Sequence, residues 1–214
     1  RDLRFVAMSQ RGHGDSERPE TGYRMDDFAA DVIGLMDALG IENATLVGHS
    51  MGSLVAQTVA TRYPTRVNGL VLIASATTFD SDATRQLAAA LAQLSEVSRD
   101  FAREFQTSTL YAPMPDEIFT AMVDESMKVP ARVWRDALAG VMQHAGRACL
   151  SAIQTRTLLL WGAHDSYCTR EEQERLLRAI RHCRLTIYDD LAHAPHWEDP
   201  ARIVSDLVAF VRGG

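Results

Sequence analysis

Residues 44–52 read Ala-Thr-Leu-Val-Gly-His-Ser-Met-Gly, so that a short apolar run ends directly in a Gly-x-Ser-x-Gly motif. Apolar residues at helical spacing follow at once, and the whole stretch predicts a strand, a sharp turn and a helix. Such a turn forces Ser50 into a strained backbone conformation, with its hydroxyl above the strand end. We expect a Cβ at Gly48 or Gly52 to clash with the neighbouring chain. The N–H of Met51, at the helix start, is then aimed where an oxyanion would form, and the helix dipole assists it.

Composition narrows the class of protein. Of the 214 residues, 46% are hydrophobic and 23% are charged, which provides enough apolar material for a sizeable core. The net charge of −6 disfavours nucleic acid and anionic membrane surfaces as partners, and no apolar run reaches the roughly 18 residues of a membrane span. Cys149, Cys168 and Cys183 lack metal-ligand spacing, so we expect reduced thiols in a cytoplasmic protein. We predict no metal, no organic cofactor and a small-molecule substrate, while the oligomeric state stays open.

The hydrophobic pattern alternates between strands and helices. Residues 67–74, Val-Asn-Gly-Leu-Val-Leu-Ile-Ala, are apolar almost throughout, which is typical of a strand buried on both faces of a parallel sheet. The first helix should start at Asp26 or Asp27 and end at Gly40. Strands are predicted over residues 3–8, 44–47, 67–74, 157–161 and 185–188, and core helices over residues 25–39, 51–63, 169–180 and from Pro200 onward. This alternation predicts an α/β fold with a doubly wound, mainly parallel sheet.

Residues 77–152 interrupt that pattern with no strand signal. Helices are predicted there over residues 82–94, 98–107, 115–127 and 130–144. The stretch is rich in methionine and aromatic residues, which fits helix–helix packing or an apolar lid over a pocket. Under the second interpretation Met114, Met122 and Trp134, together with His49, are candidate substrate-binding residues. The chain is thus divided into a first core part (1–76), a helical lid (77–152) and a second core part (153–214).

Three chemically reactive residues follow predicted strands. Ser50 follows the strand predicted over residues 44–47, Asp165 follows the one over residues 157–161, and His193 follows the one over residues 185–188. Because a doubly wound sheet gathers the carboxyl ends of its strands, we expect the three side chains to meet. His193 can take the proton of Ser50 and return it to a leaving group, while Asp165 orients the imidazole.

Four stretches of the chain resemble the α/β-hydrolase superfamily, in its branch of lidded esterases, lactonases and haloperoxidase-like enzymes. They are Arg11-Gly-His-Gly-Asp-Ser, Val47-Gly-His-Ser-Met-Gly, Leu160-Trp-Gly-Ala-His-Asp and His193-Ala-Pro-His-Trp-Glu-Asp-Pro. The resemblance implies Ser50, Asp165 and His193 as the catalytic triad and the Met51 N–H as an oxyanion donor. The family's His-x4-Glu-x-Pro signature starts at His193, which favours this residue over His196 as the base. Ala192 stands where the family usually has glycine.

Other residues compete for these roles. Asp80 stands where some members of the superfamily carry the acid. His49 and His164 flank candidate catalytic positions and are expected in the pocket wall. Glu198 is expected to brace the histidine loop.

The resemblance also implies strands that this sequence does not supply. In the family the Arg-Gly-x-Gly turn follows the fourth strand, and the third strand lies between the fourth and the fifth. The third strand also ends in the loop that gives the second oxyanion donor. Without it, a strand over residues 3–8 loses its neighbour, and an open central ladder is costly. We therefore expect this chain to be a fragment of a longer one or to be numbered from a late start. If the chain is as short as its sequence, a hole or a rearranged sheet is expected instead.

Two classes of function fit these observations. One is a serine hydrolase that cleaves a small carboxylic ester or lactone through an acyl-enzyme, and the resemblance also allows perhydrolysis or carbon–carbon bond hydrolysis. The other is a ligand-binding or regulatory protein on the same fold, since a fold does not fix a function. Turnover separates them, because an enzyme should reach about 1 s⁻¹ or more on a good substrate.

Overall fold

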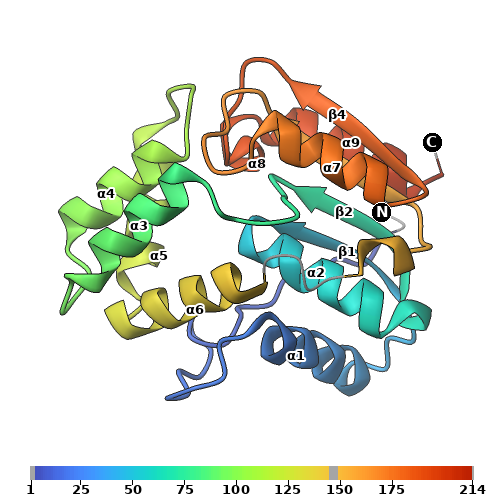
Figure 1. The fold of residues 1–214 in the computed structure, drawn as a ribbon, viewed down its shortest axis with the longest axis horizontal. Helices are drawn as coiled ribbons and strands as arrows, with labels where there is room; N and C mark the ends of the chain where they lie inside the picture. Colours follow the sequence, from blue (N-terminus) through green and yellow to red (C-terminus); the bar gives the residue numbers. More distant parts are fainter. Residues whose placement is uncertain (1–2, 145–148, 214) are drawn as a thin grey trace.

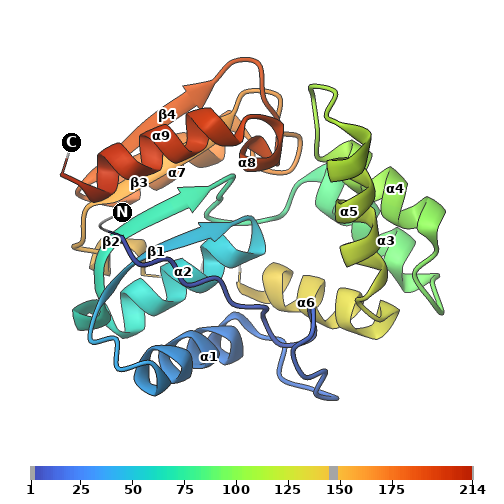
Figure 2. The ribbon, with the colours of Figure 1, turned by 180° about the vertical axis from the view of Figure 1, so that it is seen from behind.

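The computed structural model describes residues 3–144 and 149–213, and within them four parallel strands form one sheet. The strands lie in the order β1-β2-β3-β4, so sheet order and chain order agree (Figure 1; all four strands are labelled in Figure 2). They are β1 (Ala44–His49), β2 (Val67–Ile73), β3 (Thr157–Gly162) and β4 (Cys183–Tyr188). Because all four run in one direction, their carboxyl ends gather at a single edge of the sheet.

Both faces of the sheet are buried against helices. On one face, Leu72 of β2 and Leu159 of β3 join the core that includes side chains of the first, second and seventh helices. On the other face, Val71 and Leu160 pack with Phe210 of the last helix. A strand buried on both faces is apolar at almost every position, and this confirms the predicted doubly wound parallel sheet.

The longer helices fall into two groups. Those of the core flank the sheet, and those of residues 77–152, here called the helical segment, lie beyond the carboxyl ends of the strands (Figure 1). The helices that flank the sheet are α1 (Met25–Ala38), α2 (Met51–Arg62), α7 (Arg170–Ala179) and α9 (Pro200–Val211), and the helical segment holds α3 (Asp82–Ala92), α4 (Arg99–Ser108), α5 (Asp116–Met127) and α6 (Ala131–His144). The short helix α8 (Pro195–Glu198) lies at the carboxyl ends of the strands (Figure 2). None of the helices described in residues 3–144 and 149–213 is long and apolar enough to cross a membrane.

The predicted strand over residues 3–8 is wrong. This stretch is an irregular chain that passes β1 on its way to α6 (Figure 2). Phe5 is 72% exposed and Val6 is 47% exposed. A strand needs a neighbour for its ladder, and within the described residues the outer side of β1 pairs with no strand. Apolar composition alone is therefore not enough to make this segment extended and buried.

The other predicted elements are confirmed, with shifts at their ends. β3 runs one residue further than predicted, to Gly162, and β4 begins earlier, at Cys183. The first helix begins at Met25 with Arg24 as its N-cap, so the assignment of Asp26 or Asp27 to the cap was wrong. Asp27 instead accepts the backbone N–H of Arg24 at 2.9 Å and supports the first turn from inside it. The short helix α8 and the 3₁₀ turns Pro64–Arg66 and Leu150–Ala152 were not predicted.

Candidate active site

The loops after β1, β3 and β4 meet at the carboxyl edge of the sheet. The parallel register places His49 of β1 opposite Ile73 of β2, and Ile73 opposite Leu160 of β3. The chain segments that leave these strands therefore start at similar positions along the strand direction, at one edge of the sheet. They carry Ser50, Asp165 and His193, the three residues that the sequence predicts to come together.

Ser50 sits at the turn between β1 and α2 in a strained conformation. Its φ of 51° and ψ of −120° lie in a region that residues with a side chain seldom adopt. A Cβ placed on Gly48 would lie 2.2 Å from the backbone oxygen of Gly52, so only glycine permits this close approach. The same prediction for Gly52 is wrong, because a Cβ there meets only the side-chain amide of Gln10, at an ordinary 3.5 Å.

A continuous chain of hydrogen bonds joins the three predicted residues. The Ser50 hydroxyl lies 2.9 Å from Nε2 of His193, and Nδ1 of His193 lies 2.9 and 3.0 Å from the carboxylate oxygens of Asp165. His193 and Asp165 are buried, with 5% and 7% of their surface exposed. Because Nδ1 faces a carboxylate, the neutral ring carries its proton there, which leaves Nε2 free to accept the proton of Ser50. The arrangement can therefore activate a serine hydroxyl.

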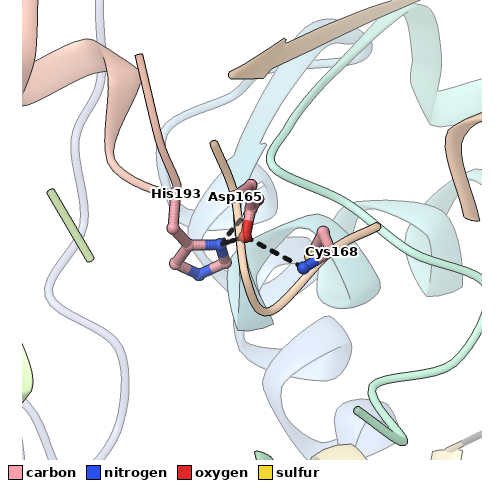
Figure 3. A group of neighbouring side chains, drawn as sticks. All are labelled: Asp165, Cys168 and His193. Carbon is pink, nitrogen blue, oxygen red and sulfur yellow. Dashed lines mark hydrogen bonds and ion pairs between the residues drawn. The ribbon is translucent and has the colours of Figure 1, made fainter. Parts of the chain in front are cut away.

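Asp165 is fixed by its own loop. Its Oδ1 also accepts the backbone N–H groups of Tyr167 and Cys168, at 2.8 and 2.9 Å, and Figure 3 shows the bonds to His193 and Cys168. At the end of β3, a Cβ on Gly162 would lie 2.3 Å from the backbone oxygen of Ala192. A glycine at this position lets the acid loop and the histidine loop approach each other closely.

Asp165, Cys168 and His193 also have the residue types of a metal site, with ligand atoms within 4.8 Å of one another. Three features of the group oppose that use. The carboxylate and Nδ1 already bind each other, and the Cys168 thiol donates to the carbonyl of Ala74 at 3.1 Å. Burial raises the pKa of that thiol well above its usual value, whereas a metal binds the thiolate. The geometry fits a hydrogen-bonded acid–histidine pair better than a set of metal ligands.

The start of α2 provides a donor next to Ser50. Met51 is the first residue of the helix, and the first four N–H groups of a helix have no partner within it. The positive end of the helix dipole adds to the attraction for an anion. The role of the Met51 N–H as an oxyanion donor stays a prediction.

The competing histidine and acid assignments do not fit the geometry. Asp80 is an exposed carboxylate that pairs with Arg85, whereas Asp165 makes the bond to His193. His196 makes no bond to Ser50, and its ring centre lies 4.3 Å from that of His49. His49 donates through Nε2 to the backbone oxygen of His193 at 2.7 Å. His49 therefore supports the histidine loop.

Burial keeps the two additional histidines neutral. It holds the pKa of His49 well below the usual value, and the nearby His196 and His193 rings lower it further. Burial also lowers the pKa of His196 to about 4, with a smaller contribution from His193. Each therefore stays uncharged beside the reactive imidazole near neutral pH.

The candidate substrate-binding residues of the helical segment lie in two environments. Trp134 packs edge-on against Phe101 and Phe105, with ring centres 5.8 and 4.8 Å away, and Met122 is 6% exposed. Met114 is partly buried in the loop before α5. No ligand contact tests these residues, so their role in substrate binding stays a prediction.

Sequence reasoning missed Tyr167. Its ring centre lies 4.9 Å from that of His193, and its hydroxyl lies 2.8 Å from the hydroxyl of Ser108 at the end of α4. Tyr167 therefore joins the site to the helical segment. Its position two residues after Asp165 is the only signal in the sequence.

Comparison with known proteins gives a family match over most of the chain. The family model described as "alpha/beta hydrolase fold" matches residues 1–200. The solved structure of an esterase from Exiguobacterium antarcticum superposes with a TM-score of 0.87 at 22% identity, covering 95% of this chain and 80% of that one. At that identity the likeness shows the fold alone.

Two curated relatives align along nearly the whole chain. A 2-hydroxymuconate semialdehyde hydrolase from Pseudomonas sp. (strain CF600) is 29% identical over 224 residues, which cover 97% of this chain and 76% of the relative. A 3-oxoadipate enol-lactonase 2 from Acinetobacter baylyi is 27% identical over 198 residues, which cover 91% and 73%. One shorter match, 47% identical over 68 residues, covers only 24% of its relative.

Proposed function

Because the chain belongs to the α/β-hydrolase family, we propose that it is a serine hydrolase that cleaves a small carboxylic ester or lactone through an acyl-enzyme. The observation that carries this proposal is the Ser50–His193–Asp165 chain of hydrogen bonds at the carboxyl ends of the strands. A neutral imidazole with its free nitrogen on a serine hydroxyl is the arrangement that nucleophilic catalysis requires.

The reaction follows from these contacts. Ser50 Oγ attacks the ester carbonyl while its proton passes to Nε2 of His193, and the carbonyl oxygen becomes an anion beside the Met51 N–H. His193 then gives that proton to the alkoxy oxygen as the bond to the acyl carbon breaks. Water, deprotonated by His193, attacks the acyl-enzyme, and Ser50 regains its proton as the carboxylic acid leaves. Asp165 stabilises the imidazolium in both halves.

The helical segment is proposed as a lid over this site, between a first core part (1–76) and a second core part (153–214). Its methionine and aromatic content suits an apolar acyl or alcohol group. Met114, Met122 and Trp134, with His49 beside Ser50, are proposed to shape the pocket.

The relatives support a small-molecule hydrolase in general, and they favour two substrate classes. The enol-lactonase relative supports an ester or lactone. The relative named for 2-hydroxymuconate semialdehyde supports carbon–carbon bond hydrolysis as the second candidate. Both chemistries use a hydrolase site, so a substrate panel must separate them.

Labelling with a fluorophosphonate, followed by intact-mass spectrometry, tests the proposal. We expect one adduct on the folded protein and none on Ser50→Ala. Hydrolysis of short p-nitrophenyl esters and enol-lactones, compared with that of 2-hydroxymuconate semialdehyde, then decides between the candidates. A folded wild-type protein that takes up no adduct would contradict an activated Ser50.

A further inference from the structure

The loop between α4 and α5 is bound to both loops of the candidate site. The backbone N–H of Ala194 donates to the carbonyl of Thr109 at 3.1 Å. The ring of Tyr111 stacks on that of His164 in the acid loop, with ring centres 3.5 Å apart and planes 3° apart. The helical segment is thus attached where His193 is held.

Glu198, at the end of α8, forms the centre of this attachment. One carboxylate oxygen accepts the N–H groups of Tyr111 and Ala112, at 2.7 and 2.9 Å. The other accepts the N–H of Ala192, the residue before His193, at 2.7 Å. A single side chain therefore bridges the α4–α5 loop and the histidine loop.

A second glutamate provides an internal comparison. Glu172, in the first turn of α7, accepts the N–H groups of Thr77 and Thr78, at 2.7 and 3.0 Å, where the helical segment begins. Its other oxygen pairs with Arg175. Both glutamates hold two successive N–H groups of the helical segment, but only Glu198 also holds the chain next to His193.

We propose that Glu198 is a positioning residue that couples the helical segment to the imidazole of His193. Through Glu198, the placement of the α4–α5 loop sets the placement of Ala192 and so the direction in which Nε2 points. The assignment rests on the proposed serine hydrolase function. It predicts that a change at Glu198 impairs the chemistry of Ser50, whereas a matched change at Glu172 affects only the fold.

Glu198→Gln tests the coupling at nearly constant shape. A glutamine has one acceptor oxygen and an NH₂ group, so one of the two loops faces a donor instead of an acceptor. We expect the fluorophosphonate labelling rate to fall about 10- to 100-fold, the range for a small misplacement of reacting groups. The low-field proton resonance of the His193–Asp165 hydrogen bond should shift or disappear.

Glu172→Gln is the control. It also removes a bond to the helical segment, so both variants should melt a few degrees below the wild type, about 2–6 °C. We expect Glu172→Gln to label at the wild-type rate and to keep the low-field resonance. Equal slowing by both variants, or wild-type labelling and resonance in Glu198→Gln, would overturn the positioning role.

Glu198→Asp keeps the test valid if the glutamine variant does not fold. The shorter carboxylate can reach one loop only, and slower labelling with an altered resonance is expected, while wild-type behaviour would overturn the proposal. A wild-type protein that does not label, yet shows a resonance sensitive to Glu198 and not to Glu172, would contradict the serine hydrolase proposal and leave the coupling supported.

Discussion

Ser50 and His193 approach each other from two differently constructed regions of the molecule. Ser50 directly follows β1, the edge strand of the described sheet, where Val47 is 47% exposed. Its position comes from adjacent residues, through a φ of 51° and the close approach at Gly48. His193 is buried in a loop held by β1, the acid loop, α8 and the helical segment.

The difference shows two ways to hold a reactive group. A tight turn holds the serine mainly by the backbone geometry of residues 48–52, and one bond, from the Ser50 N–H to the carbonyl of Ile73 at 3.0 Å, ties it to the neighbouring strand. The histidine depends on contacts from segments far away in the chain, such as His49 to the carbonyl of His193 and Glu198 to Ala192. We expect local substitutions to damage the serine side and distant ones the histidine side.

The largest effect is expected from removing either end of the reactive pair. Ser50→Ala and His193→Ala should each lower kcat by about 10⁴–10⁶-fold, because the two residues carry out one proton transfer. The double variant should be little worse than either single variant, which steady-state hydrolysis of the best ester substrate can measure. If the fold-losses in kcat of the two single variants multiplied in the double variant, the two side chains would act independently.

Asp165→Asn should lower kcat by about 10³-fold or more, since an amide no longer fixes the Nδ1–H tautomer of His193. Asp80→Asn is the matched control, because Asp80 is exposed and paired with Arg85. Its kcat should stay within about twofold of the wild type, a change typical of a surface site. The reverse ranking in the same assay would move the acid to Asp80.

The two glycines of the motif should differ in how much an added methyl group costs, although the sequence pattern treats them alike. Gly48→Ala places a methyl group against the Gly52 backbone, and we expect a loss of about 3 kcal/mol in the free energy of unfolding, together with slow labelling. Gly52→Ala meets only the Gln10 side chain and gains helix propensity, so its stability should stay within about 1 kcal/mol of the wild type. Urea denaturation of both variants measures the difference, and equal losses would refute it.

Structure that adjacent residues determine was predictable from the sequence, and structure that depends on distant segments was not. The strands and most helices were predicted within a few residues, because apolar periodicity is a local property that burial then enforces. Residues 3–8 were mispredicted because an apolar run becomes a strand only beside another strand. The four-residue helix α8 is too short to show a period.

The candidate site was predictable in its residues but not in its supports. Ser50, Asp165 and His193 each follow a strand, so topology alone brings them together. The partners of Glu198 and the place of Tyr167 depend on how the helical segment lies over the strand ends, which no local pattern contains.

The smallest effect concerns stability against pH on the histidine side. His196 is partly buried, its buried Nδ1 has no hydrogen-bond partner among the described residues, and desolvation lowers its pKa to about 4. An unfolded histidine titrates near 6.5, so acid protonates the unfolded chain before the native one. The contribution of His196 to the free energy of unfolding is therefore fully present above the pKa of the unfolded histidine, and it is lost as the pH drops toward 4.

Between pH 7.5 and 5 this single group should remove about 2 kcal/mol from the free energy of unfolding. His49 lies against His196 and has its own lowered pKa, so it contributes in the same direction. His196→Phe keeps the ring but cannot take up a proton, so its urea midpoint should fall less between these two pH values than that of the wild type. Parallel curves for the two proteins would mean that His196 is accessible to protons in the native state. Proton access to His196 would mean that a path to solvent runs through the contacts around His193. Those contacts would then be looser than the ones that hold Ser50.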